Sequence, residues 1–163
     1  MFNFCPQCGQ SQTVKAQDKT TYICNSCDWH FWNNPKAAVG IIIVRDNQIL
    51  CGTRGIEPKK GKFDLPGGFV DYGEDPYDAA KREVREETGL EVNDLELVFV
   101  GTHEYLPNIT TVDMIMVAKR WHGEPQPADD VAELTWQPIT ILASDLFAWP
   151  WPGLQAKIER TLQ

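Results

Sequence analysis

The sequence predicts an α+β fold, a sandwich built on a mixed β-sheet, preceded by a small separate module that needs a metal ion. Three observations predict it. Short β-branched and apolar runs alternate with turn residues along most of residues 35–163. One helix with clear end signals interrupts these runs near the middle of the chain. Four of the five cysteines lie in two CxxC pairs within residues 1–34, which contain little aliphatic sequence from which to build a core.

The cysteines of the first module have the spacing of a zinc site. Fifteen residues separate the two CxxC pairs, as in zinc modules of the CxxC…CxxC type. Four thiolates complete a tetrahedral shell, so we expect a structural rather than a catalytic Zn²⁺. The expected ligands are Cys5, Cys8, Cys24 and Cys27. A disulfide or a redox CxxC is the alternative, and two such pairs make it the weaker one.

The N-terminal segment and the overall charge narrow the location and the partners. The first ten residues have neither the basic nor the apolar region of a secretory signal, and the longest apolar run is too short to cross a bilayer. We therefore expect a cytoplasmic protein that does not insert into a membrane. The net charge of −8 argues against nucleic acid as a partner.

The strands of the second unit follow a boundary at Asn33-Asn34-Pro35. We expect buried strands over residues 37–45 and 48–54, joined by a turn at Asp46-Asn47, and then a loop over residues 55–62. A short strand from Phe63 leads into a glycine-rich loop. The remaining expected elements are strands over residues 95–105, 111–121 and 133–137, a short helix over 141–147 and a C-terminal helix from about residue 151.

The central helix is predicted by its end signals. Asp75 is a suitable N-cap, and Pro76 fits the first helical position. Gly89 is expected to end the helix in a left-handed conformation. Ala80 and Val84 lie one turn apart and provide an inward face.

One face of this helix concentrates carboxylates. Glu83, Glu86 and Glu87 are spaced three and four residues apart, so they share a face although like charges repel at this spacing. Two interpretations are open. Solvent and the adjacent Arg82 and Arg85 offset the repulsion, or a bound divalent cation does. Oxygen ligands of this kind select Mg²⁺ or Mn²⁺ rather than zinc.

Residues 68–90 match the Nudix box, Gx5Ex7REUxEExGU, at every defined position. The matching residues are Gly68, Glu74, Arg82, Glu83, Val84, Glu86, Glu87, Gly89 and Leu90. On these residues the chain resembles the Nudix hydrolase family over most of residues 36–140. The resemblance implies a Nudix α/β/α sandwich and hydrolysis of a phosphoanhydride bond by water at a divalent-metal site.

The resemblance also implies roles for individual residues. The expected Mg²⁺ or Mn²⁺ ligands are the carbonyl of Gly67 and the side chains of Glu83, Glu86 and Glu87. Arg82 is expected to orient these glutamates, and Glu74 to act as a supporting carboxylate. The general base is left open in the family: it is either a glutamate of the box or a distant carboxylate, here Glu104, Glu124, Asp129 or Asp130.

A zinc ribbon in front of an intact box resembles the branch that contains NADH pyrophosphatases and FAD/ADP-ribose pyrophosphatases. We therefore expect cleavage at the diphosphate of a nucleotide of the ADP-ribose, FAD or NADH type. Residues 101–108, GTHEYLPN, do not match the SQPWPFP-type motif of the NADH branch. Arg54 is the expected phosphate contact. The expected aromatic shelf for the base is drawn from Phe63, Phe69, Tyr72 and Tyr105.

Two other functions are alternatives. A (d)NTP pyrophosphatase that sanitises nucleotide pools would release pyrophosphate. A nucleotide sensor without catalytic activity would be expected to have an eroded box, which this chain does not have. A homodimer that completes the pocket across a symmetric interface is a further expectation.

Overall fold

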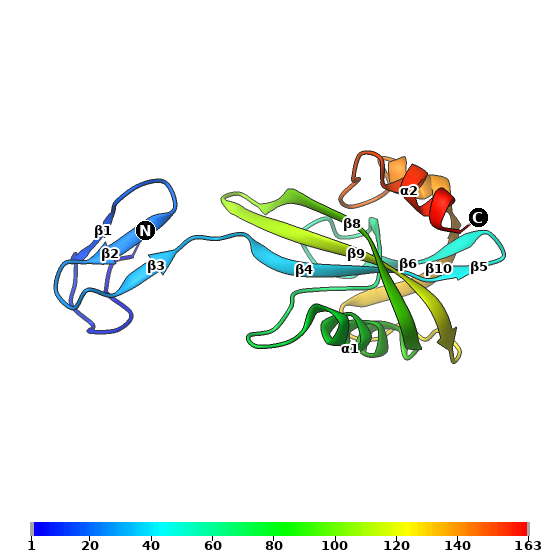
Figure 1. Cartoon of the computed structure of the whole chain (residues 1–163), viewed down its shortest axis with the longest axis horizontal. Helices are drawn as coiled ribbons and strands as arrows, with labels where there is room; N and C mark the ends of the chain where they lie inside the picture. The colour runs from blue at the N-terminus through cyan, green and yellow to red at the C-terminus, as the bar shows by residue number, and fades with distance from the viewer. Residues whose placement is uncertain (1, 163) are drawn as a thin grey trace. The chain divides into compact units, whose positions relative to one another are not determined.

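The computed structural model describes residues 2–162 of the chain. Its internal contacts divide it into two compact units, Met1–Pro35 and Lys36–Gln163 (Figure 1). Among residues 2–162, no helix is long and apolar enough to span a membrane.

The first unit is a three-stranded antiparallel sheet with a very small core. Its strands are β1 (Val14–Ala16), β2 (Thr21–Cys24) and β3 (His30–Trp32), in that spatial order. Phe2 packs edge-on against the rings of Tyr22 and Trp29. The only buried residues in the described part of this cluster are Cys5, Val14 and Cys24. A core of this size needs an additional constraint to be stable.

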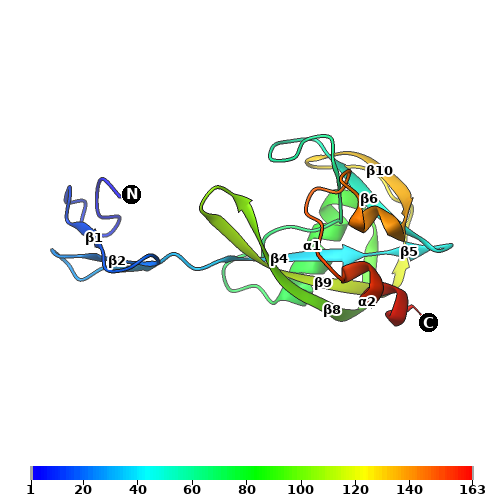
Figure 2. The same ribbon diagram turned by 90° about the horizontal axis from the view of Figure 1, so that it is seen from above.

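The second unit contains two sheets between helices. In the first sheet, β4 (Lys36–Ile42) runs parallel to β9 (Ile109–His122), and β9 is antiparallel to β8 (Glu91–Leu106). In the second, β6 (Gln48–Arg54) pairs with β5 (Val44–Arg45), β7 (Phe63–Asp64) and β10 (Val131–Pro138). Helices α1 (Pro76–Thr88) and α2 (Leu154–Thr161) lie on opposite sides of the strands (Figures 1 and 2). The predicted α/β/α sandwich is confirmed.

The apolar run that predicted the first strand is buried on both faces. Val39, Ile41 and Ile43 belong to the core that packs against α1. Ile42 belongs to the second core, which contains Leu154 of α2. Because successive side chains of a strand point to opposite faces, a strand between two helical layers is apolar at every position.

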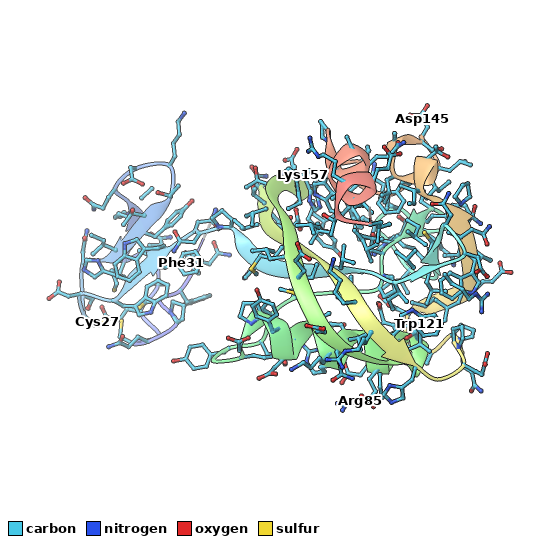
Figure 3. The ribbon with its side chains drawn as sticks, turned by 45° about the vertical axis from the view of Figure 1, so that its right-hand side comes forward. Cys27, Phe31, Arg85, Trp121, Asp145 and Lys157 are labelled. Carbon is cyan, nitrogen blue, oxygen red and sulfur yellow. The ribbon has the colours of Figure 1, made fainter. Side chains whose placement is uncertain are left out.

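Helix α1 begins and ends where its sequence predicts. The side chain of Asp75 accepts a hydrogen bond from the backbone N–H of Tyr77, and Gly89 adopts φ 70° just after the last turn. The inward residues Ala80 and Val84 are fully buried, whereas the exposed Arg85 projects from the outer face (Figure 3). The helix is therefore fixed at both ends and along one side.

The structure corrects three boundaries. The strand expected over residues 37–45 is split, because β4 and β5 pair in different sheets and the chain crosses between them at Ile43. The helix expected over 141–147 is a 3₁₀ turn, Ile139–Ala143. The last helix begins at Leu154 rather than near residue 151, because the chain contains Pro150 and Pro152 and then turns at Gly153 with φ 81°.

Candidate active site

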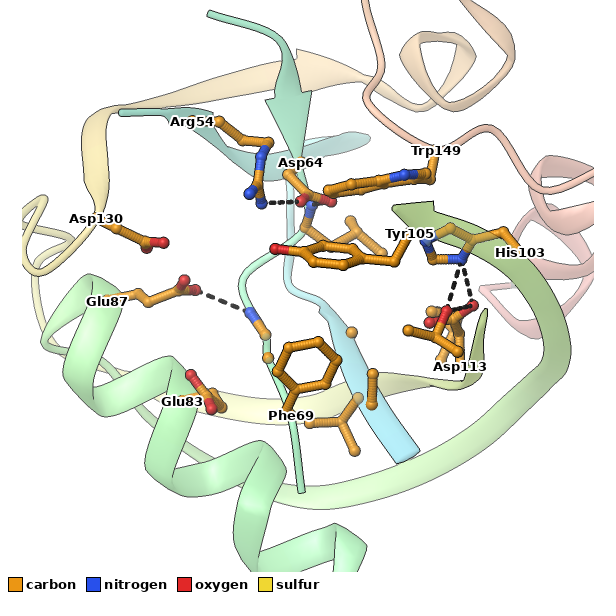
Figure 4. Close-up of a pocket in the computed structure, with 18 of the residues that line it drawn as sticks. Arg54, Asp64, Phe69, Glu83, Glu87, His103, Tyr105, Asp113, Asp130 and Trp149 are labelled. Atoms are coloured by element: carbon orange, nitrogen blue, oxygen red, sulfur yellow. Dashed lines mark hydrogen bonds and ion pairs between the residues drawn. The ribbon is translucent and has the colours of Figure 1, made fainter. Parts of the chain in front are cut away.

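A pocket of about 270 Å³ opens in the second unit, beside the amino-acid stretch that matches the Nudix box. Figure 4 shows its two contrasting sides. Glu83 and Glu87 of α1 line one side, and Trp149, His103 and Tyr105 line the other. The pocket therefore combines a carboxylate side and an aromatic side.

Glu87 is the most deeply buried carboxylate on α1. Its side chain accepts a hydrogen bond of 2.8 Å from the backbone N–H of Gly67, and the residue is only 8% exposed. Burial raises the pKa of Glu87 to about 9, and the nearby carboxylates of Glu83 and Asp130 add to the shift. Burial also raises the pKa of Glu83, although Arg82 opposes it. Two desolvated carboxylates that face one pocket form a site that a cation stabilises.

The loop before α1 presents its backbone to this carboxylate pair. The carbonyls of Pro66 and Gly68 accept hydrogen bonds from β4, from the N–H groups of Ile41 (2.8 Å) and Val39 (2.9 Å). The carbonyl of Gly67, which lies between them, accepts no backbone hydrogen bond among residues 2–162. This leaves a backbone oxygen available beside the carboxylates.

Gly68 leaves room for the carboxylate of Glu83. A Cβ atom at this position would lie 2.6 Å from Oε1 of Glu83, well inside contact distance. The φ of Gly68 is outside the left-handed region. A side chain at position 68 would therefore displace the Glu83 carboxylate, and the constraint is one of space and not of backbone conformation.

Arg82 holds the outer carboxylates together. Its guanidinium donates hydrogen bonds to Glu74 (2.8 Å), Glu83 (2.7 Å) and Glu86 (3.2 Å). The hydrogen bond from Arg82 is the main cause that lowers the pKa of Glu74 to about 2. Glu74, Arg82 and Glu86 do not line the pocket. Arg82 thus contacts the site through Glu83.

The four cysteines of the first unit form a different cluster. The sulfur atoms of Cys5, Cys8, Cys24 and Cys27 all lie within 4.8 Å of one another. Among residues 2–162, no other set of three or more His, Cys, Asp or Glu side chains brings its ligand atoms this close together. The sulfurs of Cys5 and Cys27 are 3.7 Å apart, and those of Cys8 and Cys24 are 3.9 Å apart. Four thiolates around an ion at about 2.3 Å have edges of roughly 3.8 Å. The geometry fits a four-sulfur metal site.

Aromatic rings and one arginine form the other side of the pocket. Tyr105 stacks on Trp149 with ring centroids 5.1 Å apart, and Phe69 meets Tyr105 edge-on at 5.4 Å. The guanidinium of Arg54 lies 4.6 Å from the centroid of a Trp149 ring and donates to Asp64 at 3.0 Å. Burial raises the pKa of Asp64 to about 6, against the effect of Arg54.

A buried polar cluster lies behind these rings and was not predicted. Oδ2 of Asp113, which is 4% exposed, lies 2.6 Å from Nδ1 of His103, 3.2 Å from the hydroxyl of Thr111 and 3.3 Å from Nε1 of Trp151. The signal in the sequence was an aspartate inside an otherwise apolar strand, where a buried charge requires partners. Trp149 lies far along the chain from the residues that match the Nudix box, and nothing in the sequence indicated that its ring would line the pocket.

The pocket brings together some of the residues that the sequence singled out and leaves others outside. It is lined by Arg54, Gly67, Phe69, Glu83, Glu87 and Tyr105. Phe63 lies outside the lining because it packs against the core that contains Phe147. Tyr72 is fully exposed. Of the four distant carboxylates, Asp129 and Asp130 line the pocket, whereas Glu104 and Glu124 do not.

Comparisons with known proteins agree with this architecture. The NUDIX domain model matches residues 34–156. The chain is 36% identical over 107 residues to the ADP-ribose pyrophosphatase of Methanocaldococcus jannaschii, a match that covers 64% of this chain and 63% of that protein. It is 30% identical over 129 residues to the 8-oxo-dGTP diphosphatase of Escherichia coli, covering 76% of this chain and 95% of that protein.

A solved structure matches almost the whole chain. The crystal structure of a Nudix hydrolase from Nitrosomonas europaea aligns with a TM-score of 0.73 at 26% identity, covering 99% of this chain and 90% of that chain. The box residues, the sandwich and the match over residues 34–156 lead to one conclusion: the chain belongs to the Nudix hydrolase family.

Proposed function

We propose that the protein is a divalent-metal-dependent pyrophosphohydrolase for a nucleoside diphosphate linked to another group, of the ADP-ribose, FAD or NADH type. The products are a nucleoside monophosphate and the phosphorylated remainder. The observation that carries the proposal is one pocket that joins two carboxylates, the buried Glu87 and the half-buried Glu83, to an aromatic wall. The similarity to an ADP-ribose pyrophosphatase supports it.

The residues on the carboxylate side fit a hard cation. Glu83, Glu87 and the carbonyl of Gly67 supply oxygen atoms only, which suits Mg²⁺ or Mn²⁺. Glu86, exposed and paired with Arg82, is the outermost of the proposed ligands. When bound, the metal neutralises phosphate oxygens and makes water a better nucleophile.

The other residues hold the reacting groups in place. Arg82 fixes Glu83, and Glu74 fixes Arg82. Arg54 uses part of its guanidinium on Asp64 and Pro58, and its remaining N–H groups are available for a phosphate oxygen. Asp129 and Asp130 line the pocket, and Asp130 lies beside Glu87 (Figure 4), so we propose one of these aspartates, or a box glutamate, as the group that takes the proton from the attacking water.

In the first unit we propose a structural Zn²⁺ on the four cysteines, with the zinc ribbon comprising residues 1–34 and the hydrolase domain residues 35–163. The distances between the sulfurs support four-thiolate coordination. A closed four-sulfur shell has no position for substrate, so this metal stabilises the small unit and takes no part in hydrolysis.

A second candidate function is a (d)NTP pyrophosphatase. The E. coli 8-oxo-dGTP diphosphatase matches over a larger share of this chain than the ADP-ribose pyrophosphatase does, 76% against 64%. The same carboxylates would serve either reaction, and the products distinguish them, since a triphosphate cleaner releases pyrophosphate.

Product analysis tests the proposal. Purified protein is incubated with ADP-ribose, FAD, NADH and the common dNTPs at matched concentrations, with Mg²⁺ and separately with Mn²⁺. We expect AMP from the dinucleotide-type substrates, and the highest kcat/KM among them. Glu87→Gln serves as the blank for contaminating activity, and Glu91→Gln, on the exposed start of β8, as the active control. A dNTP as best substrate with release of pyrophosphate contradicts the substrate class but not the hydrolase.

A further inference from the structure

Two buried polar atoms in the pocket have no hydrogen-bond partner. Among the described residues 2–162 they are Nε2 of His103 and Nε1 of Trp149. Both side chains line the pocket, and their rings are in contact with centroids 5.2 Å apart. Because an unpaired buried polar group is costly, its presence in a pocket points to a partner supplied by a ligand.

The surroundings of His103 determine what its free nitrogen offers. Trp151 can only donate, so its contact of 3.3 Å makes Oδ2 of Asp113 an acceptor. Nδ1 of His103, 2.6 Å from the same oxygen, therefore carries the hydrogen. In the neutral imidazole, Nε2 then holds a lone pair and accepts. A ligand that satisfies this neutral form must present an N–H or O–H group, whereas an imidazolium paired with Asp113 would donate from Nε2 to an acceptor.

Tyr105 covers a face of Trp149 and is held there by ring contacts with Trp149, Phe69 and His103. Tyr105 is half-buried and packs against the outside of the core that contains Trp149. It lies at an irregularity between Glu104 and Leu106, where β8 carries one residue more than β9. Trp149 is 8% exposed and packs in the core with Trp151. Of the two stacked rings, Tyr105 is the one that can move with little disturbance of the core.

Arg54 connects this face to the reacting end of the pocket. Its guanidinium contacts the Trp149 ring and Asp64, on the side toward Asp130 and Glu87 (Figure 4). A ring stacked on Trp149 would therefore have a phosphate-binding group between it and the carboxylates. This order of sites matches a nucleotide, in which a sugar joins a flat base to its phosphates.

We propose that Trp149 is the stacking platform for a purine base that carries an amino group. Tyr105 marks the position of this base and moves aside for it. Nε2 of His103 accepts a hydrogen bond from the edge of the base. Asp113 is the positioning residue that keeps the imidazole in this tautomer. The N–H of Trp149 lies in the indole plane, so a base stacked on the ring would not be its hydrogen-bond partner. This subsite rests on the proposed function for its role in hydrolysis, but its binding is tested without it.

Uncharged nucleosides test the subsite separately from catalysis. Adenosine, purine riboside (adenosine without its amino group) and ribose are titrated into the full-length protein without added Mg²⁺ or Mn²⁺ and without chelator, which would remove the proposed zinc, and the indole N–H signals are followed by NMR. We expect adenosine to bind at least about tenfold more tightly than ribose, the effect of stacking. We expect it to bind roughly two- to tenfold more tightly than purine riboside, the effect of one hydrogen bond.

Three variants assign the residues. His103→Phe keeps a ring but should abolish the preference for adenosine over purine riboside. Trp149→Leu should weaken adenosine binding about tenfold or more, and Tyr105→Ala should leave it unchanged or stronger. Tyr72→Ala, at a fully exposed tyrosine, is the matched control. Circular dichroism checks that each variant is folded. If Trp149→Leu does not fold, the comparison of adenosine with purine riboside in His103→Phe still tests the proposal.

Three results overturn the proposal. One is adenosine that binds no more tightly than ribose to the unaltered protein. Another is a His103→Phe variant that keeps the full preference for adenosine over purine riboside. The third is a Tyr105→Ala variant that loses adenosine binding as severely as Trp149→Leu, since Tyr105 would then be part of the site and not the marker of the position of the base. None of these results depends on hydrolysis, so a protein that cleaves no dinucleotide still gives an answer here.

Discussion

Glu87 combines burial, an ionisable carboxyl group and a backbone hydrogen bond in a single side chain. Its carboxylate faces the carboxylates of Glu83 and Asp130 with little solvent to screen them. A soluble helix normally turns such a residue outward, because burying charge is costly without a partner. The cost of burial is explained if Glu87 binds a cation. Replacements of Glu87 separate the cost of burying this group from its effect on metal binding.

Replacing Glu87 by Gln should abolish hydrolysis and preserve the fold. The amide has nearly the same shape but removes the charge that the metal needs, so we expect kcat/KM to fall at least about 100-fold, or about 2.7 kcal/mol. The melting temperature without metal should change little near neutral pH, because a carboxyl group with a pKa of about 9 is protonated there and the amide replaces an uncharged group. Glu83→Gln should lose activity similarly. Near-normal turnover by both variants at saturating Mg²⁺ would show that these glutamates are not the ligands.

Gly68→Ala tests the space beside Glu83. The added Cβ would lie 2.6 Å from Oε1 of Glu83 and must push the carboxylate away. We expect kcat/KM to fall about tenfold or more, together with a higher Mg²⁺ concentration for half-maximal rate. The backbone φ suits alanine, so the midpoint of urea unfolding should change little. A variant with normal metal dependence would indicate that the carboxylate has room to move.

Sequence alone could group the residues whose proximity follows from local spacing, and their roles stay predictions. Glu83, Glu86 and Glu87 share a face by helical periodicity, and two CxxC pairs define their own module. His103, Asp113 and Trp149 could not be placed, because their proximity depends on the pairing of β8 with β9 and on the path of the C-terminal segment. Phe63 was expected beside the base for its nearness in sequence, yet it packs into the core.

At the level of elements, α1 was predictable because its signals are local, whereas the segment after β10 was not. Caps at Asp75 and Gly89 specify the ends of α1 through contacts within a few residues. The segment containing Trp149 and Trp151 has no regular secondary structure to predict. Its position is determined by burial of two large rings, which is a tertiary effect.

Asp75→Ala tests how firmly the cap fixes α1. The side chain accepts the N–H of Tyr77 at 2.8 Å, and loss of an N-cap costs about 1 kcal/mol of the free energy of unfolding. Chemical denaturation measures the difference. Asp78→Ala, which removes a solvent-exposed aspartate paired with Lys81 on the same helix, should change stability by at most about 0.5 kcal/mol. Equal effects of both substitutions would contradict the special role of the cap.

For the whole molecule, the two compact units differ in how much hydrophobic core stabilises each of them. The second unit has two cores of its own, whereas the first, over its described residues 2–35, buries only Cys5, Val14 and Cys24. The predicted homodimer is a separate matter and stays a prediction, for which sedimentation velocity is the direct measurement.

Cys24→Ser should release the zinc and unfold the first unit alone. A four-thiolate site folds with its metal, so residues 1–34 should lose dispersed NMR signals while residues 36–163 keep theirs. Metal analysis of the unaltered protein should find about one zinc per chain. Cys51→Ala is the matched control, because Cys51 is fully buried in the second unit and lies outside the cluster. Freshly purified protein without zinc, containing Cys5–Cys8 or Cys24–Cys27 disulfides, would contradict the assignment.

The hydrogen bonds between β4 and the loop before α1 have a consequence for amide exchange. Val39 and Ile41 donate to the loop at Gly68 and Pro66, while β4 is also paired with β9. The loop that presents Gly67 therefore covers an edge of the sheet and cannot detach without exposing that strand. We expect the amides of Val39 and Ile41 to exchange with deuterium only through global unfolding, with protection equal to that of the core. Thermal inactivation should then follow the global unfolding curve and not precede it.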